Sequence, residues 1–169
     1  FTPAQKLQNR AFVAAVEVDA ASDAGTIAVM GDSISDGIGS TAGANRRWPD
    51  YLADRLSAAT KGKWGIANQG ISGNRILSDG MGDSALARLD RDILALPGIK
   101  YMIVFEGVND LGIGFGAPRN GPVPMSALPN PRIDLEQMLA GYRQLIERAH
   151  ARGIKVIGAT IAPYKGATY

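Results

Sequence analysis

The sequence predicts an α/β fold in which a parallel sheet lies between two layers of helices. Short apolar runs rich in β-branched residues alternate along the chain with longer segments whose apolar residues recur every three or four positions. This alternation is typical of βαβ units, and therefore of a parallel sheet with helices on both faces. One run, residues 101–105, is apolar at every position, as a strand buried on both faces requires.

The boundaries of the expected elements follow from local signals. The first helix carries Pro49 in its first turn, where proline is tolerated. The second helix ends at Pro97, and the third can be capped by Asp134 and ended by Gly153. The expected strands are residues 26–30, 64–68, 101–105 and 155–161, and the expected helices are residues 48–59, 84–96 and 135–152.

Two segments lie outside this alternation. Residues 1–25 are interpreted as an N-terminal extension or the end of an upstream module, although residues 12–18 could form a strand. Residues 112–131 are rich in glycine and proline and predict a long loop. Because long loops of this kind are often functional, we expect this one to shape a substrate cleft.

The bulk composition excludes several classes of protein. The 169 residues are enough for one domain with a sizeable core, and a net charge of +2 gives no reason to expect a nucleic-acid partner. The lack of cysteine excludes disulfides and cysteine-bound zinc, and a single histidine excludes a multi-histidine metal site. No apolar run approaches the roughly 20 residues that span a bilayer. We expect no cofactor, metal or membrane span; the compartment is not fixed, with secretion or the periplasm slightly favoured.

Polar, glycine-containing blocks follow three of the expected strands. The carboxyl ends of parallel strands lie at one edge of a sheet, so these three blocks should converge there. The first block, Gly31-Asp32-Ser33, follows residues 26–30, and we interpret Ser33 as a nucleophile. Taken alone, such a cluster is more often an ordinary turn.

The three blocks together resemble those of the SGNH (GDSL) family of serine esterases and acylhydrolases. Gly-Asp-Ser matches the family's first block, residues 68–74 its second, and residues 106–110 its Gly-x-Asn-Asp block. The resemblance implies a three-layer, flavodoxin-like α/β/α fold, with residues 26–169 forming an SGNH hydrolase domain. It also implies that Ser33 forms an acyl-enzyme while Gly70 and Asn109 stabilise the oxyanion.

These residue types suit the roles that the resemblance implies. Acyl transfer needs hydrogen-bond donors aimed at the oxygen on which negative charge develops. Gly70 has no side chain to block the approach of a ligand to its N–H, and the neutral amide of Asn109 can donate without adding charge. Each residue also has a plainer interpretation, as part of a turn that follows a strand.

The family's last block, Asp-x-x-His, has no match in this sequence. The only histidine is His150, which lies in the last turn of the third expected helix, where the helix dipole favours a cation. The residue three before it is Glu147, not aspartate. We therefore expect the base and its aspartate beyond residue 169, a domain incomplete at its C-terminus, and little activity from this chain alone. The remainder of the protein, as a separate chain, is an expected partner.

The sequence leaves three functions open. The leading hypothesis is a serine esterase, and the resemblance implies short-chain or carbohydrate O-acetyl esters as substrates. The second is a non-catalytic carbohydrate- or ligand-binding pseudoenzyme, which gains support if the complete protein lacks Asp-x-x-His. The third, nucleotide binding, depends on Gly112, Gly114 and Gly116, whose spacing is not that of a dinucleotide loop and which no expected helix follows.

Overall fold

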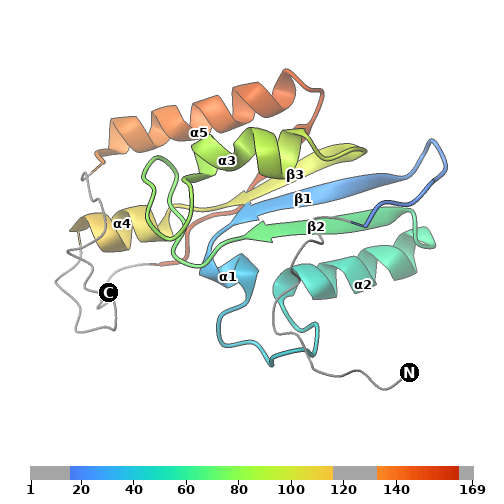
Figure 1. The fold of residues 1–169 in the computed structure, drawn as a ribbon. Coiled ribbons are helices and arrows are strands. Elements are labelled where there is room, and N and C mark those ends of the chain that lie inside the picture. Colours follow the sequence, from blue (N-terminus) through green and yellow to red (C-terminus); the bar gives the residue numbers. More distant parts are fainter. Residues whose placement is uncertain (1–15, 116–132, 164–169) are drawn as a thin grey trace, which may run out of the picture.

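The computed structural model of the chain describes residues 16–115 and 133–163, which form an α/β fold (Figure 1). A four-stranded sheet runs in the order β2-β1-β3-β4, and every pair of neighbouring strands is parallel. The predicted fold class is confirmed. The strands are β1 (Gly25–Gly31), β2 (Trp64–Gly70), β3 (Ile99–Phe105) and β4 (Lys155–Gly158).

Helices lie on both faces of the sheet. In Figure 1, α3 and α5 lie over one face and α2 lies under the other. A π-helical turn, η1, continues α3 without a break, so the second expected helix is present with a change of winding in its middle. The helices are α1 (Ser33–Asp36), α2 (Trp48–Thr60), α3 (Ala85–Leu89), η1 (Asp90–Leu94), α4 (Val108–Phe115) and α5 (Leu135–His150).

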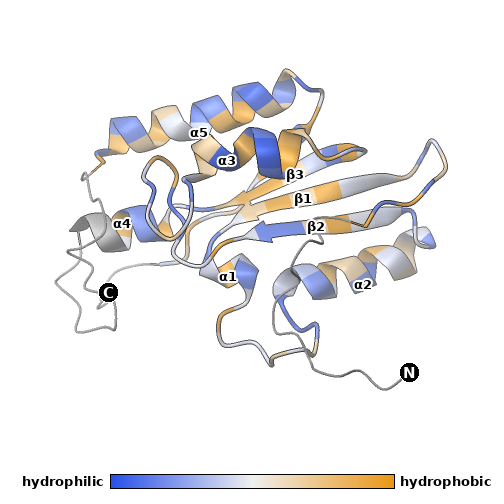
Figure 2. Cartoon of the chain, viewed as in Figure 1, coloured by the Kyte–Doolittle hydropathy of each residue, from blue (hydrophilic) through white to orange (hydrophobic). Residues whose placement is uncertain are grey.

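The hydrophobic core lies between the sheet and the layer formed by α3 and α5. Apolar positions alternate with polar ones along both helices, and the apolar side faces the strands (Figure 2). Burial of this apolar surface is the main favourable contribution to folding. The core residues are Ala28, Met30, Ile76, Ala85, Leu89, Ile93, Met102, Val104, Ile133, Met138, Leu145, Ala149 and Ile154.

The opposite face of the sheet is less fully buried in the described part of the chain. Strand β3 alternates between buried Met102 and Val104 and half-buried neighbours, so the prediction of burial on both faces holds for one face only. Helix α2 packs mainly on β2, and only Pro49 of that helix is buried. Trp48 reaches β3, where its ring meets Phe105 edge-on at a centroid distance of 6.4 Å.

Three sequence predictions about boundaries change. Residues 112–115, expected in a loop, belong to α4, while the rest of that expected loop lies outside the described residues. The last strand ends at Gly158 and not at residue 161. Residues 16–18 have no regular structure, and the rest of the strand considered at residues 12–18 lies outside the described residues.

The direction in which strands are added to the sheet reverses at β1. The connection from β1 leads outward to β2, and the next connection returns across β1 to β3. In open α/β sheets the crevice that forms at such a reversal is the usual position of a ligand site. The segments that follow β1 and β3 carry Ser33 and Asn109.

Candidate active site

Ser33 lies in a tight strand-to-helix turn. It is the first residue of α1, and the Asp32 side chain caps this helix by accepting a hydrogen bond from the Ile34 N–H at 2.9 Å. Gly31 must be glycine, because a Cβ at that position would collide with the Ser35 side chain. Ser33 itself is partly exposed. The turn therefore presents the Ser33 side chain at the surface while its neighbours are fixed.

The short helix α1 is held in place from two sides. The Trp48 indole N–H donates to Ser35 Oγ at 3.2 Å, and the Asn68 amide donates to the Ser35 carbonyl at 2.7 Å. Ser35 is fully buried. A four-residue helix is unstable in isolation, so these bonds from α2 and β2 are what keep Ser33 in position.

Gly70 lies where the end of β2 meets α1. Its N–H donates to Asn68 Oδ1 at 3.0 Å, so this donor is already engaged. A Cβ on Gly70 would lie 2.7 Å from the Ser35 carbonyl carbon and would also clash with the Asp36 nitrogen. Glycine is therefore required here because the end of β2 lies directly against α1.

The N–H of Gly73 is positioned between the other site residues. Its neighbour Ser72 hydrogen-bonds the Asp36 carboxylate of α1, and its other neighbour, Asn74, accepts a bond from Asn109. Within the described residues the Gly73 N–H has no hydrogen-bond partner, and its φ of 77° favours glycine. Gly73 thus lies between α1 and Asn109 with a free donor.

Asn109 is buried near the start of α4. One hydrogen of its amide group is donated to the Asn74 carbonyl at 3.0 Å. The next residue, Asp110, accepts the Ile76 N–H at 3.1 Å from each carboxylate oxygen. The structure therefore brings the second and third sequence blocks together, as their convergence at one sheet edge predicted.

A buried charged cluster lies beneath these residues. Arg88 of α3 and Glu106 at the end of β3 have fully buried side chains whose nearest charged atoms are 3.6 Å apart. Among the residues that the structure describes, neither oxygen of the Glu106 carboxylate has a hydrogen-bond partner. Asp32 and Asp110 are also almost completely buried. The carboxyl edge therefore holds three buried acids and two buried arginines, Arg75 and Arg88.

Burial raises the pKa values of all three acids. Desolvation raises the pKa of Asp32 and raises that of Asp110 to about 6. The pKa of Glu106 is raised well above its usual value, first by burial and then by the charge of Asp32. The nearby Arg88 cation opposes this change. Burial therefore makes ionisation of these three acids less favourable than it is in water.

His150 lies far from this cluster in the fold. It is exposed at the end of α5, and the chain continues from there to the start of β4, at the opposite edge of the sheet from Ser33. It is also the only histidine of the 169 residues. Consequently no histidine of this chain lies beside Ser33.

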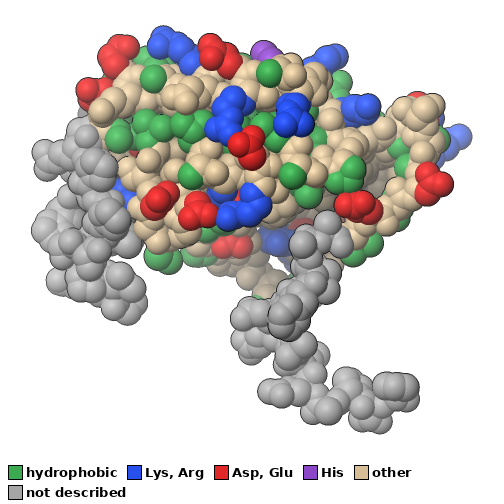
Figure 3. Space-filling view, turned by 45° about the horizontal axis from the view of Figure 1, so that its top comes forward, with side chains coloured by type: hydrophobic (Ala, Val, Ile, Leu, Met, Phe, Trp, Pro, Cys, Tyr) green, Lys and Arg blue, Asp and Glu red, His purple; other side chains and the backbone are tan. Residues whose placement is uncertain are grey.

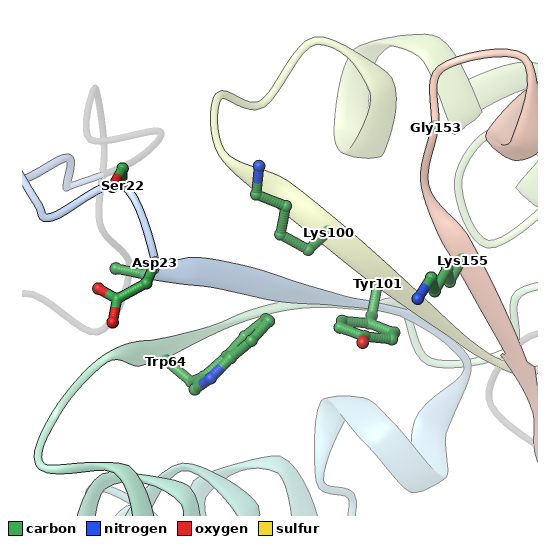
Figure 4. A pocket seen from close by; sticks show the side chains of 8 residues that line it. Ser22, Asp23, Trp64, Lys100, Tyr101, Gly153 and Lys155 are labelled. Atoms are coloured by element: carbon green, nitrogen blue, oxygen red, sulfur yellow. The ribbon is translucent and has the colours of Figure 1, made fainter.

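A cavity of about 250 Å³ lies at the amino edge of the sheet, and Figure 4 shows its Trp64 and Tyr101 rings side by side. None of Ser33, Gly73 and Asn109 lines this cavity. Its lining residues are Ser22, Asp23, Ala24, Trp64, Lys100, Tyr101, Gly153 and Lys155.

The described residues contain no group of three histidine, cysteine or acidic side chains arranged to hold a metal ion. Among the same residues, no helix has both the length and the apolar character needed to cross a membrane.

Sequence reasoning missed Arg88, Glu106 and Gly73. Arginine and glutamate are usually exposed, and Arg88 lies in a helix whose apolar pattern was attributed to other positions. The available signal was the phase of Ala85, Arg88 and Asp92, which repeat at helical spacing next to the apolar stripe. Gly112 and Gly114, considered for a nucleotide loop, lie inside α4, while Gly116 is outside the described residues.

Comparison with solved structures gives several matches to esterases. AlinE4, an SGNH-hydrolase family esterase, matches with a TM-score of 0.62 and 20% identity over 88% of this chain and 66% of its own. TesA matches with a TM-score of 0.61 and 24% identity over 84% of this chain and 64% of its own. The psychrotrophic esterase EstA of Pseudoalteromonas sp., inhibited by monoethylphosphonate, matches with a TM-score of 0.56 and 20% identity, over 84% of this chain and 63% of its own.

These identities establish the fold, and the chain spans about two thirds of the length of these structures. No curated protein sequence matches the chain. The family model of GDSL-like lipases and acylhydrolases matches residues 29–169, which include the Ser33 turn, the segment with Gly73 and the start of α4. On this match, the chain belongs to the GDSL-like lipase/acylhydrolase family.

Proposed function

We propose that this chain carries the nucleophile and the oxyanion donors of a serine esterase that hydrolyses carboxylic esters. The observation that carries the proposal is the set of hydrogen bonds joining three separate segments at one sheet edge. Ser72 binds Asp36 of α1, and Asn74 accepts from Asn109 of α4. Ser33, the Gly73 N–H and the Asn109 amide thereby belong to one fixed unit. Family membership supports the same reaction class.

The proposed reaction proceeds through an acyl-enzyme. Ser33 Oγ attacks the ester carbonyl carbon and loses its proton to a general base, and that proton then leaves with the alcohol. Water attacks the resulting acyl-serine, which releases the carboxylic acid and returns the proton to Ser33. The oxyanion of each tetrahedral intermediate accepts hydrogen bonds from the Ser33 and Gly73 N–H groups and from the second hydrogen of the Asn109 amide. Gly73 takes the role that sequence reasoning gave to Gly70.

The general base of this proposal lies outside residues 1–169. The sole histidine, His150, is exposed at the other edge of the sheet, and both oxygens of the Asp110 carboxylate already accept the Ile76 N–H. We propose that residues 26–169 are the first part of the hydrolase domain, with residues 1–25 as an extension. The base histidine and its aspartate then come from the remainder of the protein, and this chain alone turns over slowly.

Short-chain or carbohydrate O-acetyl esters are the proposed substrates. Two exposed apolar side chains adjoin the proposed nucleophile and donor: Ile34 follows Ser33, and Met81 lies against Gly73. Their exposed fractions are 41% and 48%. Two such side chains provide apolar contact for a small acyl group, which supports a short acyl chain over a long one.

The test is intact-mass spectrometry after treatment with a fluorophosphonate, which traps activated serines. On the 169-residue chain we expect slow labelling that added imidazole accelerates, because imidazole is a neutral base near pH 7. The matched control is Ser33→Ala, which should not be labelled under either condition. Rapid labelling without imidazole would contradict the external base.

A lack of labelling even with imidazole would favour the alternative function, a non-catalytic domain that binds a carbohydrate or another ligand. Labelling on a residue other than Ser33 would contradict the assignment of the nucleophile. Either result would therefore remove the esterase proposal for this site.

A further inference from the structure

We propose that Arg88 is a positioning residue that holds the Ser33 turn and the Asn109 amide in a common frame. This inference rests on the proposed esterase function, which it extends by a residue that does not touch the substrate. The guanidinium group of Arg88 lies under the carboxyl edge and has no exposed surface.

The guanidinium binds the carboxyl ends of two neighbouring strands. Arg88 Nη2 donates to the Gly31 carbonyl at the end of β1 at 3.2 Å, and Nη1 donates to the Gln69 carbonyl near the end of β2 at 2.7 Å. Gly31 precedes Ser33 by two residues. Its carbonyl also accepts the Ile71 N–H at 2.9 Å. Arg88 therefore fixes the backbone from which the Ser33 turn begins.

The same guanidinium reaches Asn109 through a single intermediate residue. Arg88 Nε donates to the Asn74 side-chain oxygen at 3.0 Å, and the backbone carbonyl of Asn74 accepts the Asn109 amide at 3.0 Å. A rotation of Asn74 would therefore move the partner of the Asn109 amide. Because the fork of an arginine has fixed angles, these bonds set the Ser33 turn and Asn109 relative to each other.

Two acidic side chains face the buried guanidinium. Asp92 of η1 accepts a hydrogen bond from Arg88 Nη1 at 3.2 Å, and Glu106, the residue after β3, lies 3.6 Å from the guanidinium. Within the described residues neither Glu106 carboxylate oxygen has a hydrogen-bond partner, so Glu106 adds no direct bond to the frame. The two roles are therefore separable: Asp92 and Glu106 face the charge of Arg88, and the Arg88 donors set geometry.

A purely structural role for Arg88, as the counter-charge of Glu106, makes a different prediction. Removing one member of a buried pair leaves an uncompensated charge, whereas removing both members is often tolerated. The double variant R88M/E106Q should therefore recover much of the stability that R88M loses. If Arg88 only balances charge, reactivity of Ser33 should recover as well, but positioning predicts that it will not.

The experiment measures fluorophosphonate labelling of Ser33 in the presence of imidazole, as a function of reagent concentration. We expect R88K and R88M/E106Q to lower the maximal labelling rate ten- to a hundredfold, because small displacements of reacting groups cost about that much. The half-saturating concentration should change less than threefold. The matched control is R91K, because Arg91 of η1 is exposed and pairs with Asp83 and Asp92. Acidic and basic side chains are interleaved on the surface of the molecule (Figure 3).

Wild-type labelling rates in the folded double variant would overturn the proposal, as would an R91K effect equal to that of R88K. Should R88K fail to fold, R88M/E106Q decides alone. This arm requires that wild-type Ser33 is labelled.

A second arm separates failure of this proposal from failure of the esterase assignment. Proton–nitrogen NMR spectra of the chain report the Asn109 side-chain amide and the Ser33 amide without any reaction. R88K and the double variant should shift both sets of resonances, whereas R91K should leave them in place. If wild-type Ser33 is never labelled, the esterase function fails but this arm still decides the positioning. Unshifted Asn109 and Ser33 resonances in the Arg88 variants would overturn it.

Discussion

The two edges of the sheet bury very different side chains. At the carboxyl edge, polar and charged groups are enclosed and bonded to one another, while at the amino edge charged groups are exposed and the partly buried side chains are aromatic. There, Trp64 and Tyr101 have ring centroids 5.5 Å apart, and the exposed Lys155 lies 5.7 Å from the Tyr101 centroid. The buried polar residues of the carboxyl edge include Asp32, Ser35, Asn74, Arg75, Arg88, Glu106, Asn109 and Asp110.

This difference shows that the carboxyl edge fixes the positions of its polar groups at a cost in folding free energy, whereas the amino edge does not. Burying a polar group costs free energy unless each donor and acceptor is satisfied, and a buried charge costs more. These free-energy costs apply at the carboxyl edge, where the buried Glu106 carboxylate has no hydrogen-bond partner among the described residues. The amino edge avoids them. Changes at the carboxyl edge should therefore have larger effects than matched changes at the amino edge.

The largest expected effect comes from removing the buried cation. Arg88→Met should lower the free energy of unfolding by about 3–5 kcal/mol, because it removes the buried cation that Asp92 and Glu106 face, together with its hydrogen bonds to the Gly31 and Gln69 carbonyls. The matched change at the amino edge, Lys155→Met, should cost less than about 1 kcal/mol, since it removes one exposed cation–π contact. Urea denaturation of both variants measures the difference. Equal losses would contradict the contrast between the edges.

The free energy of unfolding should decrease as the pH rises from 4 to 7. The pKa of Asp110 is about 6 in the folded chain against 3.8 for the free group, so the folded state retains a proton that the unfolded state releases. This contribution is present below pH 4 and is lost as the pH rises through 6, a change of about 3 kcal/mol for a shift of roughly two units. Burial raises the pKa values of Asp32 and Glu106 in the same direction.

The measurement is urea denaturation at several values between pH 4 and pH 7. Asp110→Asn should reduce the slope over this range. The acids with lowered pKa values, Asp23, Asp50 and Asp92, act below pH 4 and oppose the effect only there. A stability that increases between pH 4 and pH 7 would show that these buried carboxyls are ionised in the folded chain.

A smaller effect distinguishes two glycines of the same strand. Gly70→Ala should destabilise the chain by about 1–3 kcal/mol, because its Cβ would collide with the backbone of α1. Gly65→Ala is the control, since its Cβ would meet only the Thr26 hydroxyl at 3.6 Å. Thermal unfolding followed by circular dichroism compares the two. If Gly70→Ala were as stable as the control, the close contact between β2 and α1 would be wrong.

The smallest effect is expected for an ion pair at the amino edge. Asp23 and Lys63 form a salt bridge whose side chains are both about half exposed. Such exposed pairs contribute little because water and salt screen them. Asp23→Asn should therefore leave the urea midpoint unchanged within error. A clear drop would mean that the amino edge is less tolerant than its exposure indicates.

The sequence was informative about the fold because the strands and helices of this chain have strong, regular patterns. The run at residues 26–30 and the helix at residues 135–152 were found at nearly their observed positions. Helix α4 was missed because Gly112 and Gly114 lower helix propensity, although the segment continues the helix that starts at Val108. Tertiary contacts, which local propensity does not include, decide such segments.

The site was predicted less completely than the fold. Ser33 and Asn109 were identifiable because their blocks follow strands whose ends meet. The oxyanion donor was assigned to Gly70, whose requirement for glycine comes instead from its contact with α1. The spacing of residues along a chain does not show which N–H is already bonded. Nor does it show that Arg88 is buried, since that depends on strands distant from it in sequence.

The strand order also determines how this chain can reach its native state. The central strand β1 pairs with β3 more than seventy residues later in the chain, and with β2 nearly forty residues later. None of the four described strands is joined to its neighbour by a hairpin, so this sheet cannot form from local contacts alone. Folding must lose the entropy of closing long loops before strand pairing can stabilise the chain. We therefore expect folding to be slow, on the order of milliseconds to seconds. Until β3 arrives, the β1 edge that will pair with it stays open to other chains, and aggregation then competes with folding.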